Sequence, residues 1–120
     1  MLKLMIVDDS NVIRKKIERL HGNSLFKVVA KAGNGEEALT QWQEHQPDVV
    51  TMDITMPQMD GLEATKALLE KDPYLRILIV SALSDKETAI EALQVGAKGF
   101  LCKPFDDNEL KSALENIIRE

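Results

Sequence analysis

Five short runs rich in valine, isoleucine, leucine and methionine recur along the chain. Runs of this length and composition are typical of strands buried within a sheet. They are LKLMIV (2–7), FKVVAKA (26–32), DVVTM (48–52), RILIVS (76–81) and KGFLCK (98–103). In the second run, Lys27 and Lys31 alternate with apolar neighbours, which indicates a strand at the edge of its sheet.

The segments between these runs have the spacing of amphipathic helices. Ile13, Ile17 and Leu20 recur at i, i+4 and i+7 in the first of them. Four pairs, each a capping residue followed three positions later by glutamate, predict where later helices begin. They are Asn34 with Glu37, Asp60 with Glu63, Ser84 with Glu87, and Asp106 with Glu109.

Strands that alternate with helices predict an α/β domain in which a parallel sheet is covered on both faces. Right-handed crossovers, with an edge position for residues 26–32, favour five strands in the order 2-1-3-4-5 with five helices. In such a sheet, ligands bind beyond the carboxyl ends of the strands, beside the switch point between the first and third strands.

Polar residues stand where the predicted strands end. Asp8 and Asp9 follow the first strand, Asp53 follows the third, and Ser81 and Lys103 end the fourth and fifth. Taken singly, each has an ordinary interpretation: Asp9 as a helix cap, Asp53 as the start of a turn. Ser81 and Lys103 would be a strand-end residue and a surface lysine. The coincidence of all five at one sheet edge favours a functional site.

The charge of this cluster points to a cation. Three ionised carboxylates and one ammonium sum to −2, and carboxylates about 4 Å apart repel by roughly 4 kcal/mol at an effective dielectric of 20. The cluster should raise a carboxylate pKa or bind Mg²⁺, which prefers oxygen ligands. With the ion bound, a phosphoryl group could approach. Lys103 and Ser81 would then hold phosphate oxygens, and Asp53 would be the nucleophile.

The composition agrees with this interpretation. A chain of 120 residues, 44% hydrophobic and 29% charged, is expected to form one soluble globular domain over residues 1–120. The net charge of −5 argues against nucleic acid as a direct partner. The apolar start is too short for a signal peptide or membrane insertion, and Cys102 is the single cysteine. Both observations favour a cytoplasmic protein.

The motifs IVDDS, DITMPQMDG, ILIVSA and GAKGFLCKPF resemble, in this order, the receiver domain of bacterial two-component response regulators. The resemblance covers essentially the whole chain and implies a flavodoxin-like three-layer sandwich. It implies that Asp53 accepts a phosphoryl group from the phosphohistidine of a histidine kinase or phosphotransfer protein. It also implies a Mg²⁺ site formed by Asp9, Asp53 and the backbone carbonyl of Thr55, with Asp8 contributing directly or through water.

The resemblance further implies how a signal leaves the site. Ser81 and Lys103 would contact the phosphate, and the Lys103–Pro104 bond would be cis. Ser81 would move toward the phosphate and an aromatic side chain at position 100 would turn inward, which changes the surface of the fourth helix, fifth strand and fifth helix for a downstream target protein. Phe100 stands where many relatives have tyrosine, so core packing is an equal interpretation. The same surface is the family's usual dimer face, so a weak homodimer stands beside a monomer.

Other interpretations explain less of the sequence. GNGEEA (33–38) matches a dinucleotide fingerprint, but it follows the second strand and not the first. Its two glutamates would also repel a pyrophosphate, which has the same sign of charge. An aspartate-nucleophile phosphatase usually has its nucleophile on the first strand. A binding module that has lost phosphorylation usually lacks a site residue. The prediction is a stand-alone, chemotaxis-type signalling domain, not an enzyme with a separate substrate. A receiver cut from a longer regulator with a DNA-binding or enzymatic domain is the alternative.

Overall fold

Five strands alternate with five helices in the computed structural model, which describes residues 1–19, 25–54, 56, 59–82 and 86–119. The strands are β1 (Leu2–Val7), β2 (Phe26–Ala32), β3 (Val49–Met52), β4 (Arg76–Ser81) and β5 (Gly99–Cys102). The helices are α1 (Asn11–Glu18), α2 (Gly35–His45), α3 (Gly61–Lys71), α4 (Lys86–Gln94) and α5 (Asp107–Ile118). All five predicted strands are present, with β3 and β5 slightly shorter than the apolar runs that predicted them.

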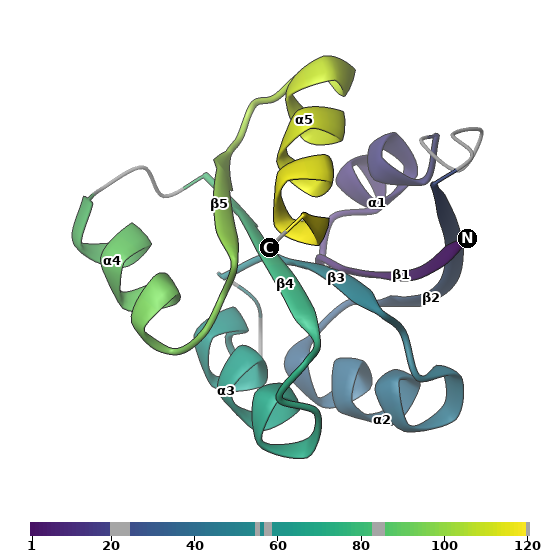
Figure 1. Cartoon of the computed structure of the whole chain (residues 1–120), viewed down its shortest axis with the longest axis vertical. Coiled ribbons are helices and arrows are strands. Elements are labelled where there is room, and N and C mark those ends of the chain that lie inside the picture. Colours follow the sequence, from purple (N-terminus) through teal and green to yellow (C-terminus); the bar gives the residue numbers. More distant parts are fainter. Residues whose placement is uncertain (20–24, 55, 57–58, 83–85, 120) are drawn as a thin grey trace.

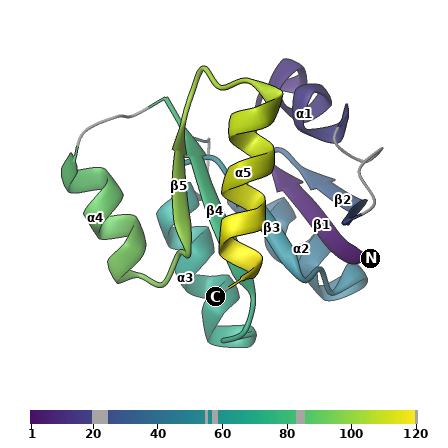
Figure 2. The same ribbon diagram turned by 45° about the horizontal axis from the view of Figure 1, so that its top comes forward.

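The strands form one parallel sheet in the order β2-β1-β3-β4-β5, which confirms the predicted topology (Figure 1). Helices α1 and α5 cover one face, and α2, α3 and α4 cover the other (Figure 2). Strand β2 lies at an edge, where Lys27 and Lys31 are exposed as their alternation with apolar residues predicted. Among the described residues, no helix is both long and apolar enough to cross a membrane.

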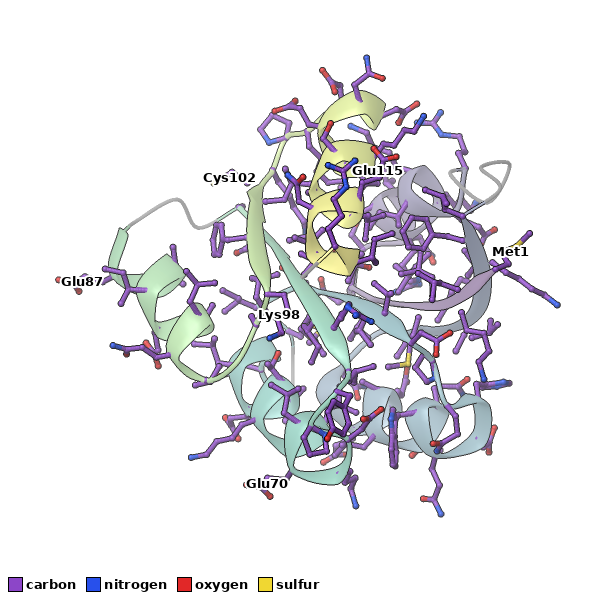
Figure 3. The ribbon with its side chains drawn as sticks, in the orientation of Figure 1. Met1, Glu70, Glu87, Lys98, Cys102 and Glu115 are labelled. Atoms are coloured by element: carbon purple, nitrogen blue, oxygen red, sulfur yellow. The ribbon has the colours of Figure 1, made fainter. Side chains whose placement is uncertain are left out.

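Two apolar layers hold the helices to the sheet (Figure 3). Side chains that alternate along a strand point to opposite faces, so β1, β3 and β4 contribute to both layers. The layer under α1 and α5 includes Leu4, Ile6, Ile17, Leu78, Val80, Phe105, Leu110 and Leu114. The layer under α2, α3 and α4 includes Met5, Val7, Val50, Met52, Ala64, Leu68, Ile77 and Ile79. Because β1, β3 and β4 are buried from both sides, their polar ends are held at fixed positions.

The helix starts follow most of the predicted caps. Asn34, Asp60 and Asp106 each accept a hydrogen bond from the backbone N–H three residues later, at 2.7–2.9 Å. Ser84 lies outside the described residues. The interpretation of Asp9 as a helix cap is wrong, because the hydroxyl of Ser10 caps α1 by accepting from the Ile13 N–H at 3.3 Å. The helix starts one residue later than that interpretation required, so Asp9 stays in the loop above the sheet.

Helix α3 begins directly against the end of β3. The Gly61 N–H donates to the Ile54 carbonyl at 2.8 Å, and a Cβ at residue 61 would lie 1.9 Å from the Asp53 carbonyl oxygen. Only glycine permits this approach, since any side chain would collide with backbone. The start of α3 therefore holds the backbone that carries Asp53.

Candidate functional site

Three carboxylates converge at the carboxyl ends of β1 and β3. Asp8, Asp9 and Asp53 each offer an oxygen within 4.8 Å of the others. The sheet ladder continues one residue past both strands, because the Asp8 N–H donates to the Ala32 carbonyl and the Asp53 N–H to the Val7 carbonyl. Asp8 and Asp53 are 1% and 5% exposed, whereas Asp9 faces solvent. The predicted convergence of residues that are far apart in sequence is present.

Lys103 reaches this cluster from β5. Its ammonium lies 2.7 Å from a carboxylate oxygen of Asp8 and 3.5 Å from one of Asp53. The other oxygen of Asp8 accepts from the Ser10 N–H at 2.9 Å, so both oxygens of Asp8 are held. The Lys103–Pro104 bond is cis, as the resemblance implied. Lys103 is therefore a cation at the centre of the site and not a surface lysine.

The pKa of Asp53 is raised from 3.8 to about 6, chiefly because its carboxyl group is buried. The negative charges of Asp8 and Asp9 contribute to this increase, and Lys103 opposes it. The single ammonium is too little positive charge for three close carboxylates. Three carboxylates whose negative charge is only partly balanced by one ammonium fit a hard divalent cation such as Mg²⁺. Thr55, whose carbonyl the resemblance adds to this set, lies outside the described residues.

Ser81 and Phe100 lie on the neighbouring strands. Ser81 ends β4, is buried, and its carbonyl accepts from the Lys103 N–H at 2.8 Å. Its register partner on β5 is Cys102, which is exposed on the outer side of that strand (Figure 3). Phe100 pairs with Ile79 and packs, half-buried, against the apolar layer under α2, α3 and α4. This contact is the core-packing role that the sequence offered for Phe100 as the alternative to a switch. Packing of this kind needs no contact between Phe100 and the acidic cluster.

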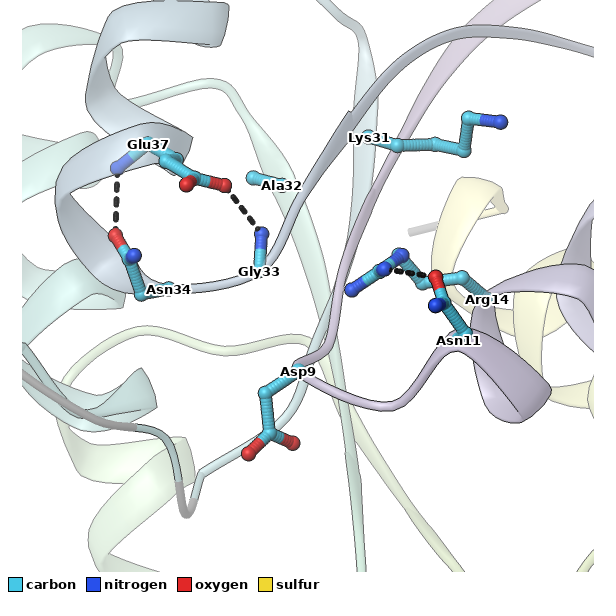
Figure 4. A pocket seen from close by; sticks show the side chains of 8 residues that line it. All are labelled: Asp9, Asn11, Arg14, Lys31, Ala32, Gly33, Asn34 and Glu37. Carbon is cyan, nitrogen blue, oxygen red and sulfur yellow. Dashed lines mark hydrogen bonds between the residues drawn. The ribbon is translucent and has the colours of Figure 1, made fainter.

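The loop that matches the dinucleotide fingerprint is occupied by its own side chains (Figure 4). The Glu37 carboxylate accepts from the Gly33 N–H at 2.8 Å, and Asn34 accepts from the Glu37 N–H at 2.9 Å. A phosphate would need these N–H groups and would meet the Glu37 charge. The loop therefore starts α2, and a polar pocket of about 480 Å³ separates it from the loop after β1.

Two cations of α1 contact the loops that follow β1 and β5, and the motifs did not reveal them. Arg14 donates to the Asp8 carbonyl. It also donates to the side chain of Asn11 (Figure 4). Lys16 donates to the Phe105 carbonyl, and its ammonium lies 4.5 Å from the centroid of the Phe105 ring. A signal for Lys16 was present, because it follows Ile13 by three positions and so lies on the apolar face of α1.

The comparisons with known proteins agree with this geometry. The family model of the response regulator receiver domain matches residues 4–115. The chemotaxis protein CheY of Listeria monocytogenes is 45% identical over 119 residues, which cover 99% of this chain and 100% of that protein. CheY of Bacillus subtilis is 40% identical over 116 residues, 97% of each chain. A methylesterase/glutaminase of Syntrophomonas wolfei is 45% identical over 98% of this chain but only 35% of its own length.

Solved structures show the same fold. CheY in the CheX-CheY-BeF3-Mg²⁺ complex from Borrelia burgdorferi is 32% identical, with a TM-score of 0.93 over 98% of this chain and 89% of that one. CheY4 of Vibrio cholerae is 34% identical, with a TM-score of 0.89 over 98% of both chains. Homology to CheY across the whole chain, together with the acidic cluster, shows that this protein is a phosphorylation-controlled signalling switch. The chain belongs to the family of response regulator receiver domains.

Proposed function

We propose that Asp53 is the phosphoacceptor of this receiver. The observation that supports this proposal is the position of Asp53, whose carboxylate is buried at the end of a central strand. Oxygens of Asp8 and Asp9 lie within 4.8 Å of it, and the Lys103 ammonium lies at 3.5 Å. An oxygen of Asp53 attacks the phosphorus of a phosphohistidine on a histidine kinase or phosphotransfer protein. The new O–P bond forms as the N–P bond breaks, and the imidazole leaves with the electron pair.

Asp8, Asp9 and Asp53, with the backbone carbonyl of Thr55, would hold Mg²⁺. When bound, the ion neutralises carboxylate charge and the charge that develops on the phosphoryl oxygens. Lys103, whose ammonium already lies beside the carboxylates of Asp8 and Asp53, would bind a phosphoryl oxygen as a further anion. Ser81, buried at the neighbouring strand end, donates its hydroxyl to another phosphoryl oxygen.

The signal leaves through α4, β5 and α5. Movement of Ser81 toward the phosphate opens space into which Phe100 turns, so the local bond at Asp53 biases two packings of this surface. Ile90 and Leu93 of α4 are 45% and 51% exposed, which supports an apolar contact with a downstream target protein. The relative from Borrelia burgdorferi is in complex with CheX in its solved structure. The same surface would form a weak homodimer.

The chemotaxis relatives support a stand-alone, cytoplasmic signalling role for residues 1–120. In this role the protein inserts into no membrane, binds no nucleic acid directly, and promotes its own phosphorylation and dephosphorylation, with no separate substrate. The Syntrophomonas wolfei relative, of which this chain matches only 35%, supports the alternative of a receiver that belongs to a longer regulator with a DNA-binding or enzymatic output domain.

Acetyl phosphate with Mg²⁺, followed by intact-mass measurement, tests the chemistry. We expect one added phosphate in the wild-type protein, and none in Asp53→Asn or in the presence of a chelator. Asp107→Asn, which changes an exposed aspartate of α5, should accept phosphate normally. Phosphate on a residue other than Asp53 would overturn the proposal. Continuous turnover of a simple phosphomonoester would instead favour an aspartate-nucleophile phosphatase.

A further inference from the structure

Lys16 joins α1 to the loop between β5 and α5. Its ammonium donates to the Phe105 carbonyl and lies 4.5 Å from the centroid of the Phe105 ring. Phe105 is 3% exposed and packs in the apolar layer under α1 and α5. The same cation therefore contacts the backbone and the side chain of one buried loop residue. This arrangement differs from an ordinary surface lysine, whose ammonium points into solvent.

The loop that Lys16 contacts carries Lys103. On the strand side, the Lys103 N–H donates to the Ser81 carbonyl at 2.8 Å. On the other side, Pro104 has a backbone φ angle that its ring restricts, and Phe105 follows it into the core. The backbone of Lys103 thus lies between an anchor at Ser81 and an anchor at Phe105, and Lys16 is the polar contact of the second anchor.

For phosphoryl transfer at Asp53, a lysine at residue 103 is not sufficient, because its ammonium must also lie in the right place. It must lie close to Asp53 while it also pairs with Asp8, at the 3.5 Å and 2.7 Å that the structure shows. Groups that act on a reacting centre need to be held within about 0.5 Å of their productive geometry. A long lysine side chain reaches that precision only if its backbone is fixed on both sides.

We propose that Lys16 is a positioning residue for phosphoryl transfer: by holding Phe105, it fixes the loop that places the Lys103 ammonium beside Asp53. The proposal rests on the proposed function of Asp53. Helix α1 then supports the site twice, because Arg14 donates to the carbonyl of Asp8 from the same helix. The two residues that pair across the site, Asp8 and Lys103, are both held by α1.

Lys16→Met is the first test, because methionine keeps the apolar stem and removes the ammonium. We expect the rate of phosphorylation by acetyl phosphate, at saturating Mg²⁺, to fall roughly tenfold, since a misplacement of 1 Å can cost up to about 100-fold. The affinity for Mg²⁺ should not change, because Lys16 contacts none of the three carboxylates. Lys15→Met removes the same charge from an exposed neighbour on α1 and should leave the rate unchanged. Lys16→Arg, which keeps a donor and a cation, should restore most of it.

A double-mutant cycle separates positioning from general stability. The binding of BeF3, a phosphoryl mimic, can be measured by NMR titration in the wild-type and Lys103→Met backgrounds. If Lys16 acts through Lys103, then Lys16→Met weakens binding in the wild-type background and has no further effect beside Lys103→Met. Equal losses in both backgrounds, or a loss of Mg²⁺ affinity in parallel, would overturn the proposal.

Two controls distinguish a loss of positioning from unfolding of the variant and from failure of the proposed function of Asp53. A thermal melt establishes whether Lys16→Met is folded; if it is not, Lys16→Ala, which also removes the donor and the charge, is measured in the same cycle. If the wild-type protein is phosphorylated on Asp53 and Lys16→Met is phosphorylated equally fast, the positioning role fails and the proposed function stands. If Asp53→Asn still takes up phosphate, the proposed function itself fails.

Discussion

At the scale of single residues, Asp53 combines two demands that conflict. Its position at the end of β3 buries the carboxylate beside Asp8, which raises its pKa from 3.8 to about 6. Phosphoryl transfer needs the same carboxylate ionised. A pKa raised to that extent corresponds to roughly 3 kcal/mol of unfavourable free energy when the group is charged at neutral pH. The folded protein without a cation is therefore destabilised by its own nucleophile.

Asp53→Asn should stabilise the protein at neutral pH. Because the folded state binds the Asp53 proton more tightly than the unfolded chain does, the wild-type protein loses stability as the pH rises from about 4 to about 7. We expect a free energy of unfolding higher by roughly 1–3 kcal/mol in the variant at pH 7.5 without Mg²⁺. Urea melts at several pH values should show this difference shrinking toward pH 4. A constant difference across that range would contradict the assignment of the raised pKa to Asp53.

Lys103→Met should raise the pKa of Asp53 further. The Lys103 ammonium lowers that pKa by its charge and by a hydrogen bond, so its removal leaves burial and Asp8 unopposed. An NMR titration of the Asp53 side-chain carbon, without Mg²⁺, should give a midpoint above that of the wild-type protein. Lys98→Met, at the opposite end of β5, is the matched control, because Lys98 is exposed and contacts the Ile77 carbonyl only through its backbone (Figure 3). An equal midpoint in both variants would argue against the ion pair.

At the scale of elements, the site depends on how closely helices start against strand ends. Helix α3 begins where Gly61 touches the backbone of Asp53, and α2 begins where Asn34 and Glu37 close their own loop. Helix α1 contributes Arg14 and Lys16 to the loops after β1 and β5. Each of these contacts joins a helix to the strand end that carries, or adjoins, a site residue.

Gly61→Ala tests the closest of these contacts. A Cβ at this position would lie 1.9 Å from the Asp53 carbonyl oxygen, so either α3 or the end of β3 must move. We expect a loss of about 3 kcal/mol or more, the upper range for overpacking, together with slower phosphorylation. Gly33→Ala is the control, since its Cβ would lie 3.5 Å from flexible side-chain atoms of Arg14 and Glu37. Chemical denaturation that ranks both variants as equally stable would contradict the close approach.

At the scale of the whole molecule, Mg²⁺ should link the site to global stability. A ligand that binds only the folded state raises the free energy of unfolding by RT ln(1 + [L]/Kd), about 1.4 kcal/mol at ten times the dissociation constant. The melting temperature should therefore rise with Mg²⁺ in the wild-type protein. Asp9→Asn should show a smaller rise and Asp107→Asn the full one. Equal responses of all three proteins would place the ion elsewhere.

Much of this architecture could be predicted from the sequence because the signals are local. The apolar runs predicted all five strands, and the lysines at 27 and 31 predicted the edge position of β2. The caps at Asn34, Asp60 and Asp106 were predicted in the same way, since a cap bonds to a residue three positions away. The cap at Asp9 was wrong by one residue, because Asp and Ser are both good caps and local sequence does not rank them.

The sequence by itself determined the elements, their order in the sheet and the convergence of Asp8, Asp9, Asp53 and Lys103 at one edge. Only the tertiary structure decided which of these groups are buried, how far apart their oxygens lie, and that Lys16 contacts Phe105, 89 residues further along the chain. The physical reason is the separation along the chain over which each effect acts. A hydrophobic period acts between neighbours in sequence, whereas a raised pKa or a positioning contact depends on the packing of helices against strand ends that no local pattern encodes.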